Sequence, residues 1–216
     1  MSVRLYAATT NSGKIKEFNQ MTQVHGVVVM PLPGMEELPV VEETGATFSA
    51  NARLKAEAYS LAAQGDAAGQ LVFADDSGLC VDVLHGAPGV FSARYALYSE
   101  GKDISAPPSS ARIFMDSDNN SKLLHELKHF DATHRQARFV CLIAVARSGK
   151  TLAEFTGEAH GTILDSPRGS GGFGYDPLFY FPELKKTFAE LSVEEKSKYS
   201  HRGIAFRKML ASLDGL

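Results

Sequence analysis

The sequence has 216 residues, of which 44% are apolar and 22% charged, as in a globular chain with a sizeable core. Its formal net charge is −3 and it has no run of Lys and Arg, which argues against nucleic acid as a partner. The two cysteines, Cys80 and Cys141, lie in apolar stretches and predict buried thiols rather than a disulfide framework. The sequence begins without a signal-peptide pattern, and no stretch approaches the ~18 apolar residues of a membrane helix, so we expect a cytoplasmic protein with no membrane partner.

Apolar runs and helical spacing predict that strands and helices alternate along the first half of the chain. We expect a strand, a helix, a strand, a longer helix and two further strands, at residues 3–8, 14–24, 26–32, 47–63, 71–74 and 79–84. Thr47 is placed to cap the longer helix. The buried stripe of that helix is predicted from residues at helical spacing, namely Leu54, Ala58, Leu61 and Ala62.

The second half of the chain begins with a polar, Pro-rich loop at residues 99–110. A helix, two long strands, a Gly-rich loop that leads into a strand, and a closing helical region follow, at residues 119–130, 137–147, 151–164, 169–181 and 192–213. The two long strands are joined through Ser148 and Gly149 and are expected to pair antiparallel. Since the chain contains no repeat and no linker, residues 1–216 are predicted to form one mixed α/β domain with a cleft between two lobes.

The sequence HELKH at residues 125–129 matches the zinc-protease pattern H-E-x-x-H. Two histidines four residues apart on a helix can share one zinc ion. At ~100° per residue, however, His125 and His129 lie nearly opposite the apolar face of the helix, which is formed by Leu123, Leu124, Leu127 and Phe130. We therefore expect a solvated pair on an amphipathic helix.

A polar turn with the sequence ATTNSGK, residues 8–14, connects the first strand to the first helix. Backbone N–H groups at the start of a helix bind anions, and Lys14 adds a positive charge. The turn lacks the spacing of a P-loop, and an ordinary helix cap explains it equally well.

Glu42 and Glu43 stand just before the helix that carries Asn51 and Lys55, which share one face because they are four residues apart. One interpretation is a metal-binding glutamate near a phosphate-binding lysine. The other is a solvated helix with carboxylates at its N-terminus, where they are favoured in any case.

Two adjacent carboxylates, Asp75 and Asp76, follow the apolar run at 71–74 and precede Ser77 and Gly78. Burying two like charges is costly without a counter-charge, and Mg²⁺ commonly binds one or two carboxylates together with substrate phosphates. A turn of the Asp-Asp-Ser-Gly type is an equal alternative for this stretch alone.

Two further blocks contain residues suited to ligand contact. In GSGGFGYDPLF, glycines let a backbone approach a ligand closely, and Phe173 and Tyr175 could stack on a base; the alternative is a tight aromatic hairpin. In SHRG, His201 and Arg202 offer several hydrogen-bond donors; the alternative is a surface pair at a helix break.

The order of the blocks ATTNSGK, EETGATFSANARLKA, ADDSGLCVDVLHGAPGVFSARYA, GGFGYDPLF and FAELSVEEKSKYSHRG resembles the inosine triphosphate pyrophosphatase family over about residues 5–210. The resemblance implies a long mixed sheet, with helices in two lobes enclosing a cleft, and a homodimer. It also implies Mg²⁺-dependent hydrolysis of the non-standard purine nucleoside triphosphates ITP, dITP and XTP to the monophosphate and pyrophosphate.

The resemblance also implies a role for each residue that matches a family motif. The catalytic positions are Asp75, Asp76 and Lys55, with Asp76 as proton acceptor, and the metal ligands are Glu43 and Asp76. The substrate-binding positions are Thr9, Asn11, Ser12, Gly13, Lys14, Asn51, Ser77, Phe173, Gly174, Tyr175, Asp176, Lys196, His201 and Arg202. On this hypothesis a water attacks the α-phosphorus while Lys14, Lys55 and Lys196 neutralise the phosphates.

The chain departs from the family pattern at Thr10, where many members have Gly, and in the long loop at 99–110, to which no role is assigned. A rival within enzymes is the septum-inhibition family of nucleotide pyrophosphatases, against which the GGFGYDP and SHRG blocks argue. A nucleotide sensor without catalysis is a further alternative, and pyrophosphate release from ITP distinguishes it.

Overall fold

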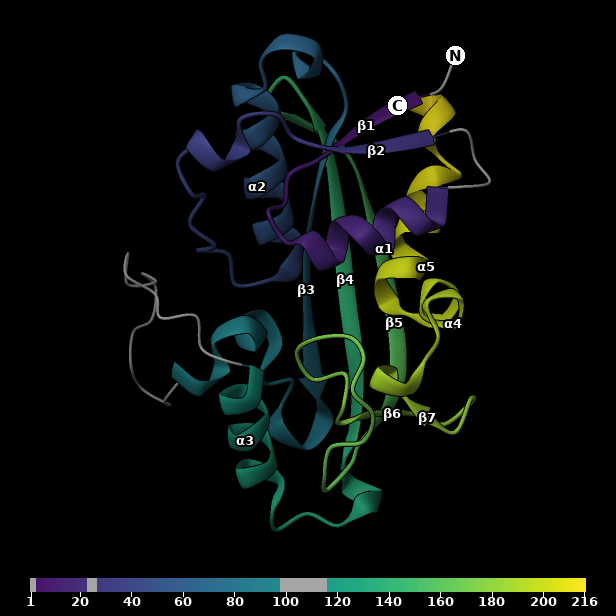
Figure 1. Ribbon diagram of the computed structural model, residues 1–216. Coiled ribbons are helices and arrows are strands. Elements are labelled where there is room, and N and C mark those ends of the chain that lie inside the picture. Colours follow the sequence, from purple (N-terminus) through teal and green to yellow (C-terminus); the bar gives the residue numbers. More distant parts are fainter. Residues whose placement is uncertain (1–2, 23–26, 98–115) are drawn as a thin grey trace. The chain divides into compact units, whose positions relative to one another are not determined.

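The computed structural model describes residues 3–22, 27–97 and 116–216 (Figure 1). The predicted loop at 99–110 therefore lies outside the described residues. Within them, seven strands form one sheet in the order β2-β1-β3-β4-β5-β6-β7. The strands are β1 Val3–Ala7, β2 Val27–Pro31, β3 Val72–Val81, β4 Gln136–Arg147, β5 Lys150–Ile163, β6 Phe179–Phe181 and β7 Lys186–Thr187.

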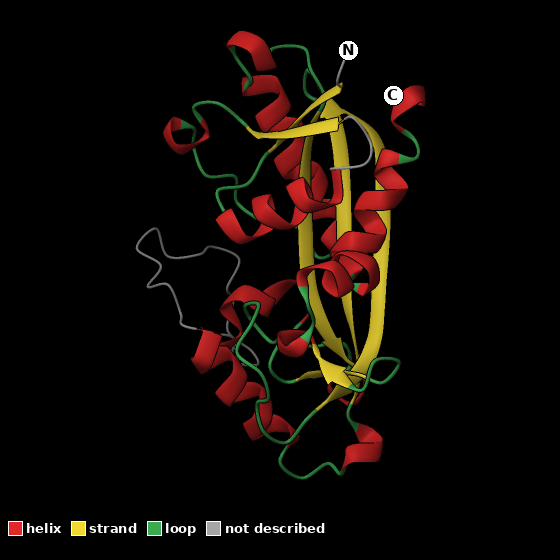
Figure 2. Ribbon diagram, turned by 45° about the vertical axis from the view of Figure 1, so that its right-hand side comes forward, coloured by secondary structure: helices red, strands yellow, loops and turns green. Residues whose placement is uncertain are grey.

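The α-helices of the described residues are drawn red and the strands yellow in Figure 2; along the chain they alternate as far as β4, after which β5, β6 and β7 precede the last two helices. They are α1 Ser12–Thr22, α2 Phe48–Ala62, α3 Asp116–Leu127, α4 Val193–Tyr199 and α5 His201–Leu210. Short 3₁₀ helices occupy Met35–Glu37, Gly65–Ala67, Asp82–Leu84, Gly89–Leu97, Ala132–His134, Phe188–Glu190 and Leu213–Gly215. None of the described helices is long and apolar enough to cross a membrane.

The sheet is mixed, as the sequence predicts. β1 pairs in parallel with β2 and with β3, whereas β6 pairs antiparallel with β5 and with β7. Ser148 and Gly149 join β4 to β5 with positive φ angles of 50° and 82°, the backbone conformation of a two-residue hairpin turn. Both cysteines are free and buried, which confirms the prediction for Cys80 and Cys141.

The chain divides into two compact units, of which the first comprises Met1–Asp76, Cys141–Glu158 and Ser197–Leu216. In this unit Phe18 of α1, Phe73 of β3 and Phe206 of α5 form an aromatic cluster with ring centroids 4.8–5.8 Å apart. Val72 and Ala74, which flank Phe73 on β3, belong to a different hydrophobic cluster, which also contains residues of α2. Successive side chains of β3 therefore alternate between the α1 and α5 face and the α2 face of the sheet.

The buried stripe of α2 differs from the predicted one. Leu54, Ala58 and Leu61 are exposed, and the residues that pack against the sheet are Ala52, Ala56 and Tyr59. Small side chains on the inner face let the helix approach the strands closely, so the larger leucines face outward. Thr47 caps α2 as predicted, because its Oγ1 accepts a hydrogen bond from Ala50 N at 3.1 Å.

The second unit comprises Ser77–Val140 and Ala159–Lys196. Its core is aromatic: Phe139, Phe179 and Phe188 have ring centroids 4.7–5.6 Å apart. Leu123 and Leu127 of α3 are fully buried, whereas His125 and His129 are exposed, as the periodicity predicts. The helix ends at Leu127, before the second histidine of the H-E-x-x-H match.

Candidate active site

The two adjacent carboxylates lie inside an unbroken strand. β3 runs from Val72 to Val81, so the predicted break between 74 and 79 is wrong. Asp75 and Asp76 are both buried, with 4% and 8% of their surface exposed. Because side chains alternate along a strand, the two carboxylates point to opposite faces of the sheet and are not side by side.

Asp75 faces α1 and α5, each of which supplies a cation. Lys14 Nζ lies 2.9 Å from Asp75 Oδ1 and 2.8 Å from Oδ2, and Arg202 Nε donates to Oδ2 at 3.4 Å. Burial alone would raise the pKa of Asp75, but Lys14, Arg202 and Lys55 outweigh it and hold the pKa well below its usual range. Asp75 is therefore expected to be ionised near neutral pH, where its carboxylate anchors two cations.

Asp76 faces α2 and is bound there by an amide and an ammonium group. Asn51 Nδ2 donates to Asp76 Oδ2 at 3.2 Å, and Lys55 Nζ donates to Oδ1 at 3.2 Å. Burial raises the pKa of Asp76; the charge of Lys55 opposes the rise, and that of Glu43 adds to it. A carboxylate with a raised pKa accepts a proton more readily, as a general base must.

Lys55 connects the strand to the loop before α2. Its Nζ donates to Glu43 Oε1 at 2.6 Å and to the Asp75 carbonyl oxygen at 2.8 Å, in addition to the Asp76 carboxylate. Burial lowers the pKa of Lys55, but Asp76, Glu43 and Asp75 together raise it above its usual value. Two carboxylates thus converge on one cation, and carboxylate oxygens are ligands that divalent metal ions commonly bind.

Asn51 holds the Glu43 loop in place. Its side chain is fully buried, with Oδ1 accepting from Gly45 N at 2.8 Å while Nδ2 reaches Asp76. A Cβ at position 45 would lie 2.6 Å from Asn51 Oδ1, so only glycine permits this approach. Both functional groups of the Asn51 amide therefore serve the arrangement of the carboxylates.

The turn before α1 is a helix cap. Asn11 Oδ1 accepts from Gly13 N at 2.9 Å and from Lys14 N at 3.2 Å, and Asn11 N donates to Thr9 Oγ1 at 3.2 Å. Ser12 is the first residue of α1. The cap fixes the start of α1, and from there Lys14 contacts Asp75.

His201 and Arg202 open α5 and are buried, with 4% and 3% exposed, which excludes the alternative of a surface pair. Ser200 caps the helix by accepting from Gly203 N at 3.0 Å. Arg202 Nη1 donates to Glu17 Oε2 at 2.6 Å, so its guanidinium lies between two carboxylates, those of Glu17 and Asp75. Glu17 could not be identified from the sequence, and the helical register of α1 places it one turn after Lys14.

In the second unit the Gly-rich loop is tightly organised around Asp176. Asp176 Oδ2 accepts from Phe173 N at 3.0 Å and from Lys196 Nζ at 2.6 Å, and Lys196 Nζ lies 5.1 Å from the centroid of the Phe173 ring. Gly172 has φ +74°, and a Cβ there would clash with Asp176 Oδ2. Phe173 is 38% exposed and can contact a ligand.

The remaining predicted residues take different positions. Tyr175 is buried, and its hydroxyl donates to the Ser92 carbonyl at 2.9 Å, so it anchors the loop and cannot stack on a base. Burial raises the pKa of Tyr175. Ser77 follows Asp76 on β3 and is half-buried. The backbone of Gly174 is bound by two residues that sequence reasoning missed, Asp116 and Asn120 of α3.

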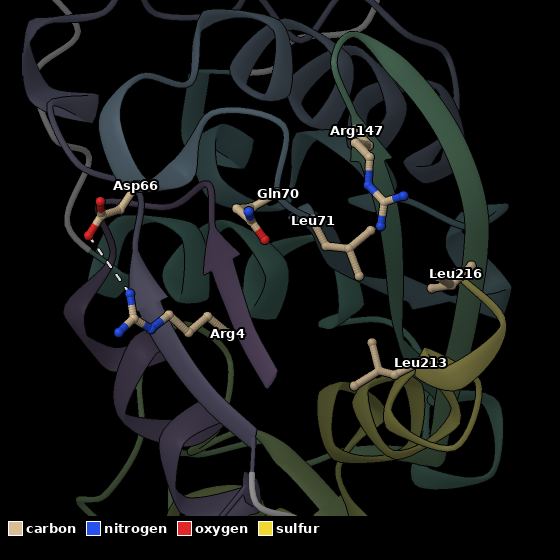
Figure 3. A pocket seen from close by; sticks show the side chains of 7 residues that line it. All are labelled: Arg4, Asp66, Gln70, Leu71, Arg147, Leu213 and Leu216. Atoms are coloured by element: carbon tan, nitrogen blue, oxygen red, sulfur yellow. Dashed lines mark ion pairs between the residues drawn. The ribbon is translucent and has the colours of Figure 1, made fainter. Parts of the chain in front are cut away.

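A hollow of about 520 Å³ in the first unit contains none of these residues (Figure 3). It is lined by Arg4, Asp66, Gln70, Leu71, Arg147, Leu213 and Leu216. Arg4 and Asp66 form an exposed ion pair of 3.8 Å at its edge. We assign no substrate to this hollow.

Buried carboxylates on both faces of one strand, with pKa values shifted in opposite directions, mark β3 as a candidate functional site. The chain belongs to the Ham1 family, whose model matches residues 5–212. It is 46% identical over 215 residues to the dITP/XTP pyrophosphatase of Acidobacterium capsulatum, covering all of both chains. It is 44% identical to the enzyme of the same name from Desulforamulus reducens, covering 99% of this chain and 97% of the relative.

The fold is also shared with solved structures. The Staphylococcus aureus Ham1 protein superposes with a TM-score of 0.78 at 38% identity, covering 98% of each chain. A HAM1 protein from Coxiella burnetii has a TM-score of 0.78 at 34% identity, covering 99% of this chain and 100% of the other. The mixed α/β class and the family predicted from the sequence are both confirmed.

Proposed function

We propose that this protein hydrolyses dITP, XTP and ITP to the corresponding monophosphate and pyrophosphate. The observation that carries the proposal is the convergence of Asp76, Glu43 and Lys55 at β3 in a Ham1-family chain. Similarity over nearly the full length to relatives named dITP/XTP pyrophosphatase supports the choice of substrates.

Mg²⁺ is part of the proposal, with Glu43 and Asp76 as the residues that would hold it. Their oxygens already lie within 2.6 Å and 3.2 Å of a single positive charge, that of Lys55, so the donor set fits a hard divalent cation. When bound, the ion would supply Lewis-acid polarisation of the triphosphate.

Asp76 is assigned as the proton acceptor. A water oxygen forms a bond to the α-phosphorus, the bond from that phosphorus to the oxygen bridging to the β-phosphate breaks, and pyrophosphate leaves with that oxygen. The water proton passes to the Asp76 carboxylate and then to solvent. Burial in the strand supports this role, because it raises the pKa of Asp76.

The positive charges have two different roles in this proposal. Lys55 lies beside Asp76 and is placed to balance charge that develops on the phosphates. Lys14 and Arg202 are held by Asp75, which fixes their positions before substrate arrives. The assignment of Lys196, Phe173 and the other residues of the second unit to the substrate rests on the family resemblance.

The homodimer and the cytoplasmic location expected from the sequence belong to the same proposal. Sedimentation at micromolar protein concentration tests the dimer, and cell fractionation tests the location. A monomer at all concentrations, or a membrane-bound pool, would contradict them.

A panel of nucleoside triphosphates with Mg²⁺ tests the proposed activity. We expect release of pyrophosphate, and of no orthophosphate, from dITP, XTP and ITP, and far slower release from dATP, dGTP and TTP. Asp76→Asn serves as the matched inactive variant. Tight nucleotide binding without pyrophosphate release would identify a sensor instead of an enzyme.

A further inference from the structure

Helix α3 binds the Gly-rich loop through the backbone of a single residue, Gly174. Asp116 Oδ2 accepts from Gly174 N at 2.6 Å, and Asn120 Nδ2 donates to the Gly174 carbonyl at 3.0 Å. Asp116 and Asn120 are four residues apart and so lie on one face of the helix. Both polar groups of one peptide residue are thereby satisfied from one surface.

The contact fixes the backbone and not a side chain. Gly174 has φ +62°, and no heavy atom lies within 4 Å of a Cβ built there. The glycine is therefore required for its conformation, whereas its position is set by the two α3 side chains. Since the acceptor of its N–H is a carboxylate, this hydrogen bond is of the stronger, charge-assisted kind.

Helix α3 is itself held firmly within the second unit. Asn119 Oδ1 accepts from Ala96 N at 2.8 Å, and Asn119 Nδ2 donates to Ala93 O at 3.2 Å. At the other end of the helix, Arg135 donates to the carbonyls of Leu127 and Phe130 at 3.1 Å and 2.9 Å. A helix anchored at both ends can serve as a rigid support for a loop.

The half-exposed Phe173 directly precedes Gly174, the residue that α3 binds. Its own N–H is fixed by Asp176, and on the other side of Gly174 the Tyr175 hydroxyl is fixed by Ser92. Of these three consecutive residues, only Phe173 leaves a large apolar side chain exposed. The hydrogen bonds that fix the loop backbone therefore also restrict the orientation of the Phe173 ring.

We propose that Asp116 and Asn120 are positioning residues that orient Phe173 for stacking on the purine base, an inference that rests on the proposed function. Neither residue has to touch the substrate. We call the contacts of Asp116 and Asn120 with Gly174 the clamp. The clamp should affect the affinity for every purine base equally and not the choice among bases, because each base presents a flat face on which the Phe173 ring can stack.

Because the sequence contains no tryptophan, a single introduced tryptophan can report on the mobility of the side chain at position 173. Phe173→Trp introduces a single indole at the position of interest, and its fluorescence anisotropy measures the local mobility of that side chain without any nucleotide. Asp116→Ala and Asn120→Ala are then made in this background and in the wild type. Asp118→Ala is the matched control, since Asp118 is exposed on the first turn of the same helix.

We expect Asp116→Ala and Asn120→Ala to lower the anisotropy of the introduced indole. In the wild-type background they should raise KM for dITP and XTP alike, by about 10-fold for one lost hydrogen bond, and change kcat much less. Asp116→Asn keeps an acceptor oxygen and should recover most of the loss, which also guards against an alanine variant that does not fold. Asp118→Ala should change neither quantity.

Unchanged anisotropy and KM in both alanine variants would overturn the positioning role. An equal change in Asp118→Ala would overturn it too, because the effect would then belong to the helix surface in general. These outcomes differ from a failure of the proposed function, in which the wild-type protein releases no pyrophosphate from any purine nucleotide while the anisotropy still responds to the clamp.

Discussion

Asp75 and Asp76 are neighbours on β3, yet their carboxylates contact different cations on opposite faces of the sheet. Asp75 binds Lys14 and Arg202, and Asp76 binds Lys55. The pKa of Asp75 is lowered and that of Asp76 is raised, so two identical groups separated by one peptide bond have opposite titration behaviour. On the proposed mechanism, the strand thereby separates an anchoring carboxylate, Asp75, from the proton acceptor, Asp76.

Asp76→Asn and Asp75→Asn should therefore have different effects although the chemical change is the same. We expect Asp76→Asn to reduce kcat by at least about 100-fold with little change in stability. Asp75→Asn removes the buried carboxylate charge that the half-buried Lys14 and the buried Arg202 share, while Glu17 still binds Arg202, and should lower the free energy of unfolding by about 3 kcal/mol. Urea denaturation and steady-state kinetics on both variants measure the two effects, and equal loss of stability in both would contradict the division of roles.

The lowered pKa of Asp75 predicts how stability depends on pH. The unfolded chain binds the proton near the usual pKa of 3.8 and the folded protein only at lower pH, so the stabilisation is present above about pH 4 and lost as the pH falls. The difference in unfolding free energy between the wild type and Asp75→Asn should narrow from pH 7 to about pH 3. A difference that stays constant over this range would show that the charge of Asp75 does not supply the stability.

Lys55→Met should change metal affinity and turnover in opposite directions. The substitution removes the cation shared by Glu43 and Asp76, so without nucleotide Mn²⁺, used as a probe for Mg²⁺, should bind on the order of 10-fold more tightly. Hydrolysis should nevertheless be slower, because the charge that neutralises the phosphates is lost. Calorimetric titration measures the first effect, and unchanged or weaker Mn²⁺ binding would place the metal away from these two carboxylates.

Arg202→Ala tests whether the buried guanidinium acts on the base or on the carboxylates. Its contacts with Glu17 and Asp75 predict a large loss of stability. A direct role in base selection, which Arg202 would exert as a donor to the 6-oxygen, predicts in addition a 10–100-fold smaller ratio of kcat/KM for ITP over ATP. An unchanged ratio at a temperature where the variant is folded would mean that base choice is made elsewhere.

His125→Ala combined with His129→Ala should leave activity and metal content unchanged. Both side chains are exposed, while Glu126 between them is bonded to the Tyr95 hydroxyl. Kinetics with dITP and metal analysis of the purified variant measure the outcome. Loss of a bound zinc ion would restore the metalloprotease interpretation of the H-E-x-x-H match.

Much of the fold and the membership of the family could be predicted from periodicity and motif order. The capping of α2 by Thr47 follows from spacing alone, and the structure contains it. The continuous β3 could not be predicted, because adjacent aspartates favour a turn unless cations distant in sequence neutralise them. Those cations come from residues 14, 55 and 202, whose approach to β3 depends on tertiary packing.

The hydrogen bonds of Asp116 and Asn120 with Gly174 could not be predicted for a similar reason. Asp116 and Asn120 lie in a polar stretch that reads as a solvated helix face, and their partner is a backbone that no side-chain pattern reveals. The helical spacing of Leu54 and Leu61 predicts the wrong buried stripe for α2. Close packing of the helix on the sheet favours the small residues instead.

Hydrolysis of dITP in oxygen-18 water tests the central claim most directly, namely that the Asp76 site cleaves the α–β phosphoanhydride by attack of water on the α-phosphorus. The account predicts one labelled oxygen in each molecule of dIMP, unlabelled pyrophosphate, and no turnover by Asp76→Asn. Label in the pyrophosphate, release of orthophosphate, or wild-type turnover by Asp76→Asn would contradict it.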